Sequence, residues 1–320
     1  MRTEKVEFYS DGVVLRGMFR SPDQPSEQPG PALVHGPGWL GLASGQNYAN
    51  WHEGLTAAGY SVLVFDYRGF GDSDGDTGWV RPDWQLEDLL NAVAYLTTRQ
   101  DVDSDRIGSY GMGGTGGGNA VLLACHDERI KAVAAQSVVA DGRDWLHRMR
   151  REYEWVAYLE QLEEDRQRWV LEGKGEIVHP REGLMVETPE RRAIAPKKDV
   201  DARMPNEFFL RSAEYIMRYR PIDVVHRISP RALLITSVEN DVVTPEDHAV
   251  ALFERAGGPK KLVRQRDTSH YRAYKENFGL LLAEIIDWYD EHLKYASVRS
   301  TEVGTAEAMT WIDNAGVGRR

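Results

Sequence analysis

The chain has 320 residues, a formal net charge of −11 and a hydrophobic fraction of 42%. This length suits one α/β domain of roughly 250 residues with an insertion, and the apolar fraction is ordinary for a globular protein. The negative charge argues against nucleic acid or an anionic membrane as the main partner. The single cysteine, Cys125, excludes an intramolecular disulfide and is typical of a reducing compartment.

The sequence predicts neither a signal peptide nor a membrane span. Residues 1–5 lack the apolar stretch with which a signal peptide continues. No run approaches the roughly 18 consecutive apolar residues needed to cross a bilayer. We therefore expect a cytoplasmic protein that does not enter a membrane.

Residues 5–58 predict a hairpin, a buried strand and a helix. Apolar and polar side chains alternate over residues 5–20 around a Ser-Asp-Gly turn, which is typical of a β-hairpin. A buried strand is expected at 31–36, and a helix at 47–58 stops at Gly59. The strand ends in a His-Gly-Pro-Gly-Trp loop, where glycines let backbone N–H groups approach a ligand. Candidates for substrate binding in this loop are His35, Gly36, Gly38 and Trp39.

A Gly-x-Ser-x-Gly sequence at 71–75 follows the strand predicted at 60–66. We reject Ser73 as a nucleophile because a loop comes next, whereas this pattern acts where a strand turns directly into a helix. The following helix is expected over 84–99, with Asp83 as its N-cap.

The stretch 106–120 organises the expected site. It predicts a strand, a tight glycine turn and a helix, the junction at which Gly-x-Ser-x-Gly sequences place a nucleophile. No serine follows Gly111 here. Gly113 and Gly114 stand at the expected position, and Thr115 alone carries a hydroxyl among residues 112–118.

The alternation of strands and helices stops in the middle of the chain. Residues 141–220 contain charged helical runs with interleaved aromatic residues and are too long for a simple connection. We expect a helical cap, inserted between core segments 1–140 and 221–296. Trp145 and Tyr153 are candidates for lining a substrate pocket, and attachment of the cap to the core is an equally good reading of these aromatic side chains.

The strand pattern resumes at 231–237, and the last strand is expected at 261–265. Asp241 follows the first of these strands and His270 follows the second. Since the carboxyl ends of parallel strands meet at one edge of a sheet, both side chains are expected at the edge that carries the glycine turn.

The chain is expected to close with an amphipathic helix at 275–293 and a tail at 297–320. The tail shows no clear period. Trp311 and Ile312 favour its attachment to this subunit or to a neighbouring one, so a homodimer stays open.

This ordered set of motifs resembles the α/β-hydrolase superfamily, with the closest likeness to capped esterase and peptidase-like members. The matching features are the His-Gly-Pro-Gly loop, the turn from Asp66 to Ser73, the glycine turn, Asp241 and His270. The resemblance implies an α/β fold with a mostly parallel central sheet, flanking helices and a helical cap. It also implies an oxyanion hole between the His-Gly loop and the turn at Gly114.

The same resemblance implies that His270 takes a proton while Asp241 orients its imidazole. In one hypothesis, Thr115 or a water above the turn replaces serine, and an ester, amide or C–C bond is hydrolysed. In a second, His270 moves the proton of a lyase or cyclisation reaction that needs no nucleophile. In a third, the protein is a non-catalytic binding member, or Gly113 is an engineered replacement of serine.

The expected partner is a small or medium-sized organic substrate. The sequence contains no metal-binding motif of the His-Glu-x-x-His or Cys-x-x-Cys kind. The glycines of 111–116 fit a dinucleotide-binding pattern by letter, but their strand is not the first of a βαβ unit. We therefore expect neither a metal nor another cofactor.

Overall fold

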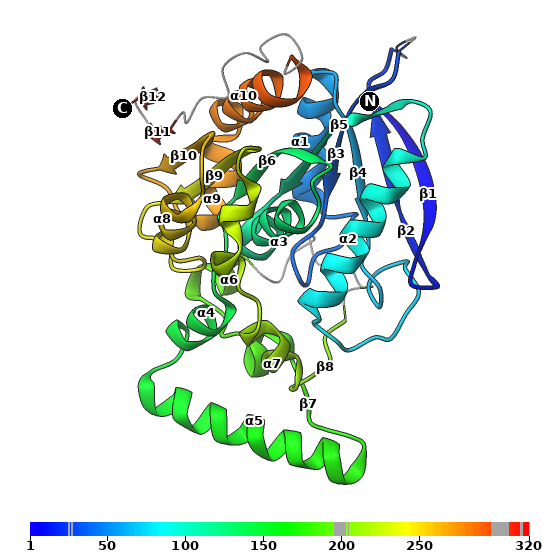
Figure 1. The fold of residues 1–320 in the computed structure, drawn as a ribbon. Coiled ribbons are helices and arrows are strands. Elements are labelled where there is room, and N and C mark those ends of the chain that lie inside the picture. Colours follow the sequence, from blue (N-terminus) through cyan, green and yellow to red (C-terminus); the bar gives the residue numbers. More distant parts are fainter. Residues whose placement is uncertain are drawn as a thin grey trace.

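The computed structural model describes residues 1–24, 26, 28–194, 203, 205–295, 307–313 and 316–319. Within these residues, ten strands form one sheet in the order β1-β2-β4-β3-β5-β6-β9-β10-β11-β12 (Figure 1). Its strands are β1 (Arg2–Ser10), β2 (Val13–Ser21), β3 (Gly30–His35), β4 (Ser61–Phe65), β5 (Val102–Gly111), β6 (Ile130–Gln136), β9 (Ala232–Val238), β10 (Lys260–Gln265), β11 (Glu307–Asp313) and β12 (Gly316–Arg319).

Helices connect most of these strands. The α-helices are α1 (Gln46–Ala57), α2 (Pro82–Thr97), α3 (Gly113–His126), α4 (Gly142–Arg148), α5 (Glu152–Glu172), α6 (Pro189–Ile194), α7 (Ser212–Met217), α8 (Glu246–Arg255), α9 (His270–Glu276) and α10 (Phe278–Tyr289). Shorter helical segments are η1 (Pro180–Leu184), η2 (Pro221–Asp223), η3 (Val225–Ile228) and η4 (Asp290–Lys294).

The strands from β4 to β11 in this order pair in parallel, and antiparallel pairs occur at both edges of the sheet. All five residues of β4 are buried, and each of them except Ser61 is apolar, as expected for a strand covered on both faces. This confirms the predicted α/β fold with a mostly parallel central sheet.

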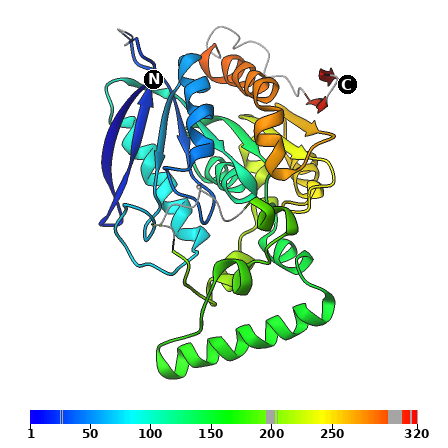
Figure 2. The ribbon, with the colours of Figure 1, turned by 180° about the vertical axis from the view of Figure 1, so that it is seen from behind.

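Helices cover both faces of the sheet (Figure 2), and the described residues form one hydrophobic cluster on each face. Leu89 of α2, Val121 of α3 and Leu252 of α8 belong to one cluster. Trp51 of α1 and Ile285 of α10 belong to the other. Burial of apolar side chains on both faces therefore fixes the sheet between two helical layers.

The predicted hairpin is confirmed, and Ser10 faces Val13 in its register. Asp11 and Gly12 both have positive φ, 49° and 83°, as a tight two-residue hairpin turn requires.

The N-cap predicted for the helix at 84–99 is wrong. Arg81 is the N-cap of α2 and Asp83 lies in its first turn, because Pro82 needs no N–H partner and is well suited to the first helical position.

The chain between β6 and β9 leaves the sheet and contains α4 to α7. Figure 1 shows α5 as a long helix set apart from the sheet. Strands β7 (Ile177–Val178) and β8 (Phe208–Phe209) pair antiparallel within this insertion. Residues 195–202 and 204 of the expected cap lie outside the described residues.

The predicted end of the sheet differs from the observed one. Residues 307–313, expected in an aperiodic tail, form β11 and pair in parallel with β10, so β10 is not the last strand. Ile312 is buried within this subunit. The strands are too short to produce a period over the whole segment, which explains the missed prediction. Residues 296–306, 314–315 and 320 lie outside the described residues.

Candidate active site

The glycine turn between β5 and α3 forms a sharp elbow with Gly113 at its apex. Gly113 is the first residue of α3 and has φ of 79°, in the left-handed region that favours glycine. Among the described residues, a Cβ built on Gly113 would meet only the Tyr274 hydroxyl within 4 Å, at 3.6 Å. The space in which a side chain at the apex would stand is therefore open apart from its contact with Tyr274.

The first turn of α3 offers backbone donors at this apex. Its N-cap, Met112, makes no side-chain capping hydrogen bond, and the first N–H groups of a helix have no partner within it. Gly114 lies in this turn, where a Cβ would come within 2.4 Å of the Thr244 hydroxyl oxygen. Glycine is thus required at Gly114 by close packing, and the helix start can receive a negatively charged oxygen.

His270 and Asp241 form the pair that the motif order predicted. The Nδ1 atom of His270 lies 2.7 Å from Oδ2 of Asp241, and both side chains are almost fully buried. The other carboxylate oxygen accepts the N–H groups of Val243 (2.7 Å) and Thr244 (3.0 Å). Because an ionised carboxylate only accepts, Nδ1 of His270 donates, and Nε2 is left as an acceptor.

The hydroxyl of Tyr274 contacts the second ring nitrogen of His270. Its hydroxyl lies 3.1 Å from Nε2, and the two rings pack edge to face. Burial, followed by the nearby Asp241 carboxylate, raises the pKa of the Tyr274 hydroxyl well above its usual range. The hydroxyl therefore stays protonated and donates a hydrogen bond to Nε2.

Sequence reasoning missed Tyr274 because it placed His270 in a loop and started the next helix at 275. In the structure His270 is the first residue of α9, so Tyr274 lies one turn further on the same face. The spacing of four residues was the available signal.

The Thr115 hydroxyl is engaged with the loop after β3. Its Oγ1 accepts the backbone N–H of Trp39 at 2.9 Å, and a Cβ on Gly38 would approach the same oxygen to 2.8 Å. Among the hydrogen bonds of the described residues, none joins Thr115 to His270. Thr115 thus links α3 to the His-Gly loop.

His35 ends a buried chain of donors. Arg20, which only donates, lies 2.6 Å from Nδ1 of His52, and Nε2 of His52 lies 2.7 Å from Nδ1 of His35. Burial lowers the pKa of His35 to about 3, so the ring is neutral. Next to it, Gly36 packs against Tyr67, whose hydroxyl would lie 2.2 Å from a Cβ. The start of the His-Gly loop is therefore fixed from inside the sheet.

The structure places the three aromatic candidates differently. Trp39 is buried and packs edge to face against Trp145, which donates from Nε1 to the carbonyl of Val243 at 2.9 Å. Trp145 thereby connects α4 to the loop of Asp241. Tyr153 lies on α5, is 64% exposed and hydrogen-bonds Arg151, so it is not brought to this group.

A cavity of 280 Å³ lies beside the pair. Its lining consists of Glu190, Glu239, Asn240, Asp241, Val242, Asp267, Thr268, Ser269 and His270. A larger cavity of 710 Å³ lies at the opposite ends of the strands, next to Arg106 and Pro230, and contains none of the candidate residues. Asp241 and His270 therefore line the smaller of these two cavities.

Glu190 was not anticipated from the sequence, which gave no signal for it. It comes from α6 of the insertion, and its carboxylate accepts hydrogen bonds from the Ser269 hydroxyl (2.6 Å) and the Tyr271 N–H (3.2 Å). The insertion thus contacts the start of the helix that carries His270.

The described residues contain neither a candidate metal-binding group nor a membrane-spanning helix. They hold no group of three or more His, Cys, Asp and Glu side chains placed to bind a metal ion. None of the helices in this part of the chain has both the length and the apolar character to cross a bilayer.

Comparisons with known proteins agree with this architecture. An uncharacterized 31.7 kDa protein of Escherichia coli is 28% identical over 89% of this chain and 97% of its own. The thiohydrolase aneE of Aspergillus aculeatus is 26% identical over 88% of this chain and 89% of its own. The crystal structure of α/β hydrolase GrgF from Penicillium sp. sh18 has a TM-score of 0.75 at 21% identity, covering 92% of this chain and all of that one.

These likenesses show a hydrolase-type enzyme of the α/β-hydrolase superfamily. The model of one family, described as X-Pro dipeptidyl-peptidase (S15 family), matches residues 11–271. This match spans most of the chain and includes the glycine elbow, Asp241 and His270. The chain therefore belongs to the X-Pro dipeptidyl-peptidase (S15) family.

Proposed function

We propose that the protein hydrolyses a carboxylic ester or thioester of a small or medium-sized molecule by direct attack of water above Gly113. The observation that carries this proposal is the combination of an intact His–Asp pair, 2.7 Å apart, with an elbow apex that has no side chain. An apex of this kind leaves room for a water where a serine hydroxyl would otherwise stand.

The proposed reaction uses the polar groups in named roles. Water bonds through its oxygen to the carbonyl carbon, its proton ends on Nε2 of His270, and the carbonyl π electrons move to the oxygen. The N–H groups at the start of α3 stabilise this oxyanion, and Asp241 stabilises the imidazolium. The oxyanion then re-forms the carbonyl, the bond to the leaving group breaks, and that group takes the proton from His270. An acid and an alcohol or thiol result.

Esters and thioesters suit this site better than amides. Their leaving groups depart without prior protonation more readily than an amine, so water activated by one histidine is a sufficient nucleophile. The relative named as a thiohydrolase supports this choice. We assign Thr115 a supporting role, because its hydroxyl already accepts the N–H of Trp39.

Turnover by variants of Thr115 and His270 tests the proposal. The probes are p-nitrophenyl butyrate and the butyryl thioester of N-acetylcysteamine. We expect Thr115→Val to retain measurable turnover, lowered through the loss of one hydrogen bond, and Thr115→Ser to approach the wild type. His270→Ala should lose on the order of 10²–10⁴-fold. The proposal is wrong if Thr115→Val is as inactive as His270→Ala while Thr115→Ser is active, since Thr115 would then be the nucleophile.

A further inference from the structure

We infer that Tyr274 is a catalytic residue, whose hydroxyl relays the proton between the water above Gly113 and Nε2 of His270. This inference rests on the proposed hydrolysis and adds the group that contacts the water. The elbow lacks the serine hydroxyl that would act as a nucleophile. In the proposed relay, the Tyr274 hydroxyl of α9 stands near that position and transfers a proton.

The position of the Tyr274 hydroxyl supports a relay. It lies 3.1 Å from Nε2 of His270 on one side and 3.6 Å from the position of a Cβ on Gly113 on the other. The hydroxyl is therefore close both to the histidine and to the apex of the elbow. A water in the place of a side chain at Gly113 would therefore be in reach of the tyrosine oxygen.

The direction of the hydrogen bonds supports the same role. Nδ1 of His270 donates to Asp241, so Nε2 accepts, and the Tyr274 hydroxyl donates to it. The oxygen of Tyr274 has two lone pairs. The Ser137 hydroxyl is a hydrogen-bond partner of this oxygen, and the other lone pair can accept a proton from water. The raised pKa of Tyr274 disfavours a free tyrosinate, which argues for concerted transfer and against tyrosine as the nucleophile.

The relay leaves the overall reaction unchanged. As the water oxygen bonds to the carbonyl carbon, one O–H bond of the water breaks and its proton goes to the oxygen of Tyr274. In the same step the original proton of Tyr274 passes to Nε2 of His270. When the leaving group departs, both transfers run in reverse, so the leaving group gains a proton and Tyr274 and His270 regain their starting forms.

Tyr271 provides a matched control on the same helix. Its ring also packs edge to face against His270, with centroids 4.8 Å apart, compared with 5.4 Å for Tyr274. Its backbone N–H bonds to Glu190, and among the described residues no hydrogen bond joins its hydroxyl to His270. Replacing either tyrosine with phenylalanine keeps the ring, but only one replacement removes the contact with Nε2.

The experiment compares Tyr274→Phe and Tyr271→Phe on the two butyryl probes, with folding read from the melting temperature. We expect Tyr274→Phe to lose on the order of 10²-fold or more in kcat with KM changed only a few-fold. Tyr271→Phe should stay within about threefold of the wild type. In mixtures of H₂O and D₂O, kcat of the wild type should depend on deuterium content along a curve, since two protons move together, and that of Tyr274→Phe along a straight line.

Two results overturn the inference while the proposed hydrolysis stands. One is a Tyr274→Phe enzyme that matches the wild type although His270→Ala is inactive. The other is a straight line for the wild type in the H₂O–D₂O series, a result that needs no variant to fold. If the wild type hydrolyses neither probe, or His270→Ala matches it, the proposed hydrolysis itself fails and the inference fails with it.

Discussion

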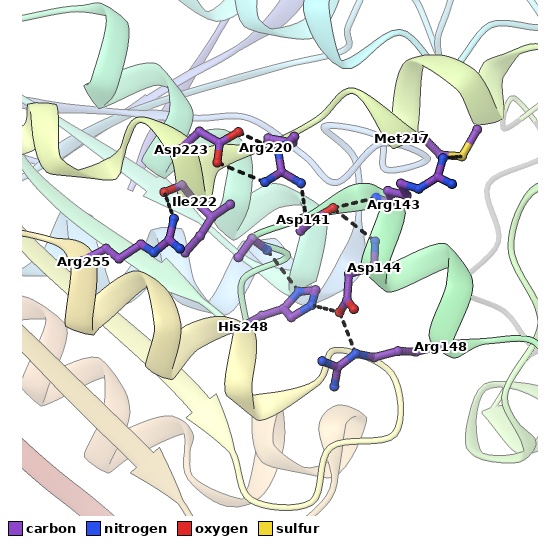
Figure 3. A network of polar contacts seen from close by, with 11 residues as sticks. Asp141, Arg143, Asp144, Arg148, Met217, Arg220, Ile222, Asp223, His248 and Arg255 are labelled. Atoms are coloured by element: carbon purple, nitrogen blue, oxygen red, sulfur yellow. Dashed lines mark hydrogen bonds and ion pairs between the residues drawn. The ribbon is translucent and has the colours of Figure 1, made fainter.

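Two histidine–aspartate pairs among the described residues have nearly the same contact distance but use different ring nitrogens, Nδ1 in His270 and Nε2 in His248. His270 and Asp241 lie 2.7 Å apart, and His248 and Asp144 lie 2.8 Å apart. In the second pair, Nδ1 of His248 accepts the backbone N–H of Ala140, and Asp144 also pairs with Arg148 (Figure 3). The second pair joins α4 of the insertion to α8 of the core.

The difference lies in the second nitrogen of each histidine. Both nitrogens of His248 are used within the protein, so its ring has no acceptor left for a substrate proton. The second nitrogen of His270 meets a tyrosine hydroxyl that borders the open apex at Gly113. A histidine–aspartate pair is thus suited to catalysis only where its second nitrogen leads toward a space that a substrate can enter, here through the Tyr274 hydroxyl.

The largest contrast is expected from removing each imidazole. His270→Ala should lower kcat/KM for the butyryl probes on the order of 10²–10⁴-fold. It should also lose about 1–3 kcal/mol of unfolding free energy, because the buried carboxylate of Asp241 loses its partner. His248→Ala should keep kcat/KM within about tenfold and lose about 1–3 kcal/mol of unfolding free energy, because it leaves buried polar groups without partners. Equal losses of activity in the two variants would break the comparison.

The two aspartates give the next contrast. Asp241→Asn is expected to lower kcat on the order of 10²-fold or more, since an amide no longer selects the tautomer of His270 in which Nε2 accepts. Asp144→Asn should change kcat less than about threefold, because Asp144 contacts no reacting group. Steady-state kinetics on both variants checks this. A slow Asp144→Asn enzyme would show that the His248–Asp144 pair controls the site.

The features of the first pair that follow from chain order could be predicted from the sequence. It predicted the parallel sheet, the hairpin, the glycine elbow and the meeting of Asp241 with His270, because each depends on local pattern and on the shared edge of parallel strands. It gave His248 no role. Its pairing depends on how α4 packs on α8, and these helices lie about 100 positions apart.

A third buried histidine extends the comparison to pH. The pKa of His35 is lowered to about 3, below the value of about 6.5 in the unfolded chain. The unfolded state therefore binds more protons below pH 6.5, and His35 makes stability fall by about 1.4 kcal/mol per pH unit as the pH drops from about 6.5 toward 3. His35→Asn should show a smaller drop in melting temperature between about pH 7 and pH 5 than the wild type.

The exposed His126 is the control for this measurement. Asparagine at position 35 keeps an acceptor for the N–H of His52. His126→Asn should leave the pH dependence of the melting temperature close to that of the wild type. A His35→Asn protein with the same pH dependence as the wild type would show that His35 is not held neutral.

The smallest effect is expected at the contact between the insertion and α9. Glu190→Ala removes the acceptor of the Ser269 hydroxyl and the Tyr271 N–H. The interaction is worth about 0.5–1.5 kcal/mol. If this whole amount holds His270 in place for the reaction, kcat should fall about two- to tenfold. Glu187→Ala is the control, since Glu187 pairs with Arg192 in the same segment. An equal decrease in both variants would assign the effect to the charge of the insertion.

Three features of the site lay beyond sequence reasoning for physical reasons. Tyr274 was placed in a loop because the helix boundary was set five residues late, and boundaries are the least reliable part of such predictions. The chain from Arg20 through His52 to His35 joins three elements that only the folded sheet brings together. The hydroxyl of Thr115 had no visible partner until the loop after β3 was placed beside it.

The absence of a covalent intermediate is the central claim, and the mass of the enzyme during turnover tests it most directly. Wild-type protein is mixed with excess p-nitrophenyl butyrate, quenched in acid within the first turnovers and measured intact by mass spectrometry. Water attack above Gly113 predicts an unmodified mass throughout and no initial burst of p-nitrophenol. A species heavier by one butyryl group, formed at the rate of the burst and mapped to Thr115, would contradict it.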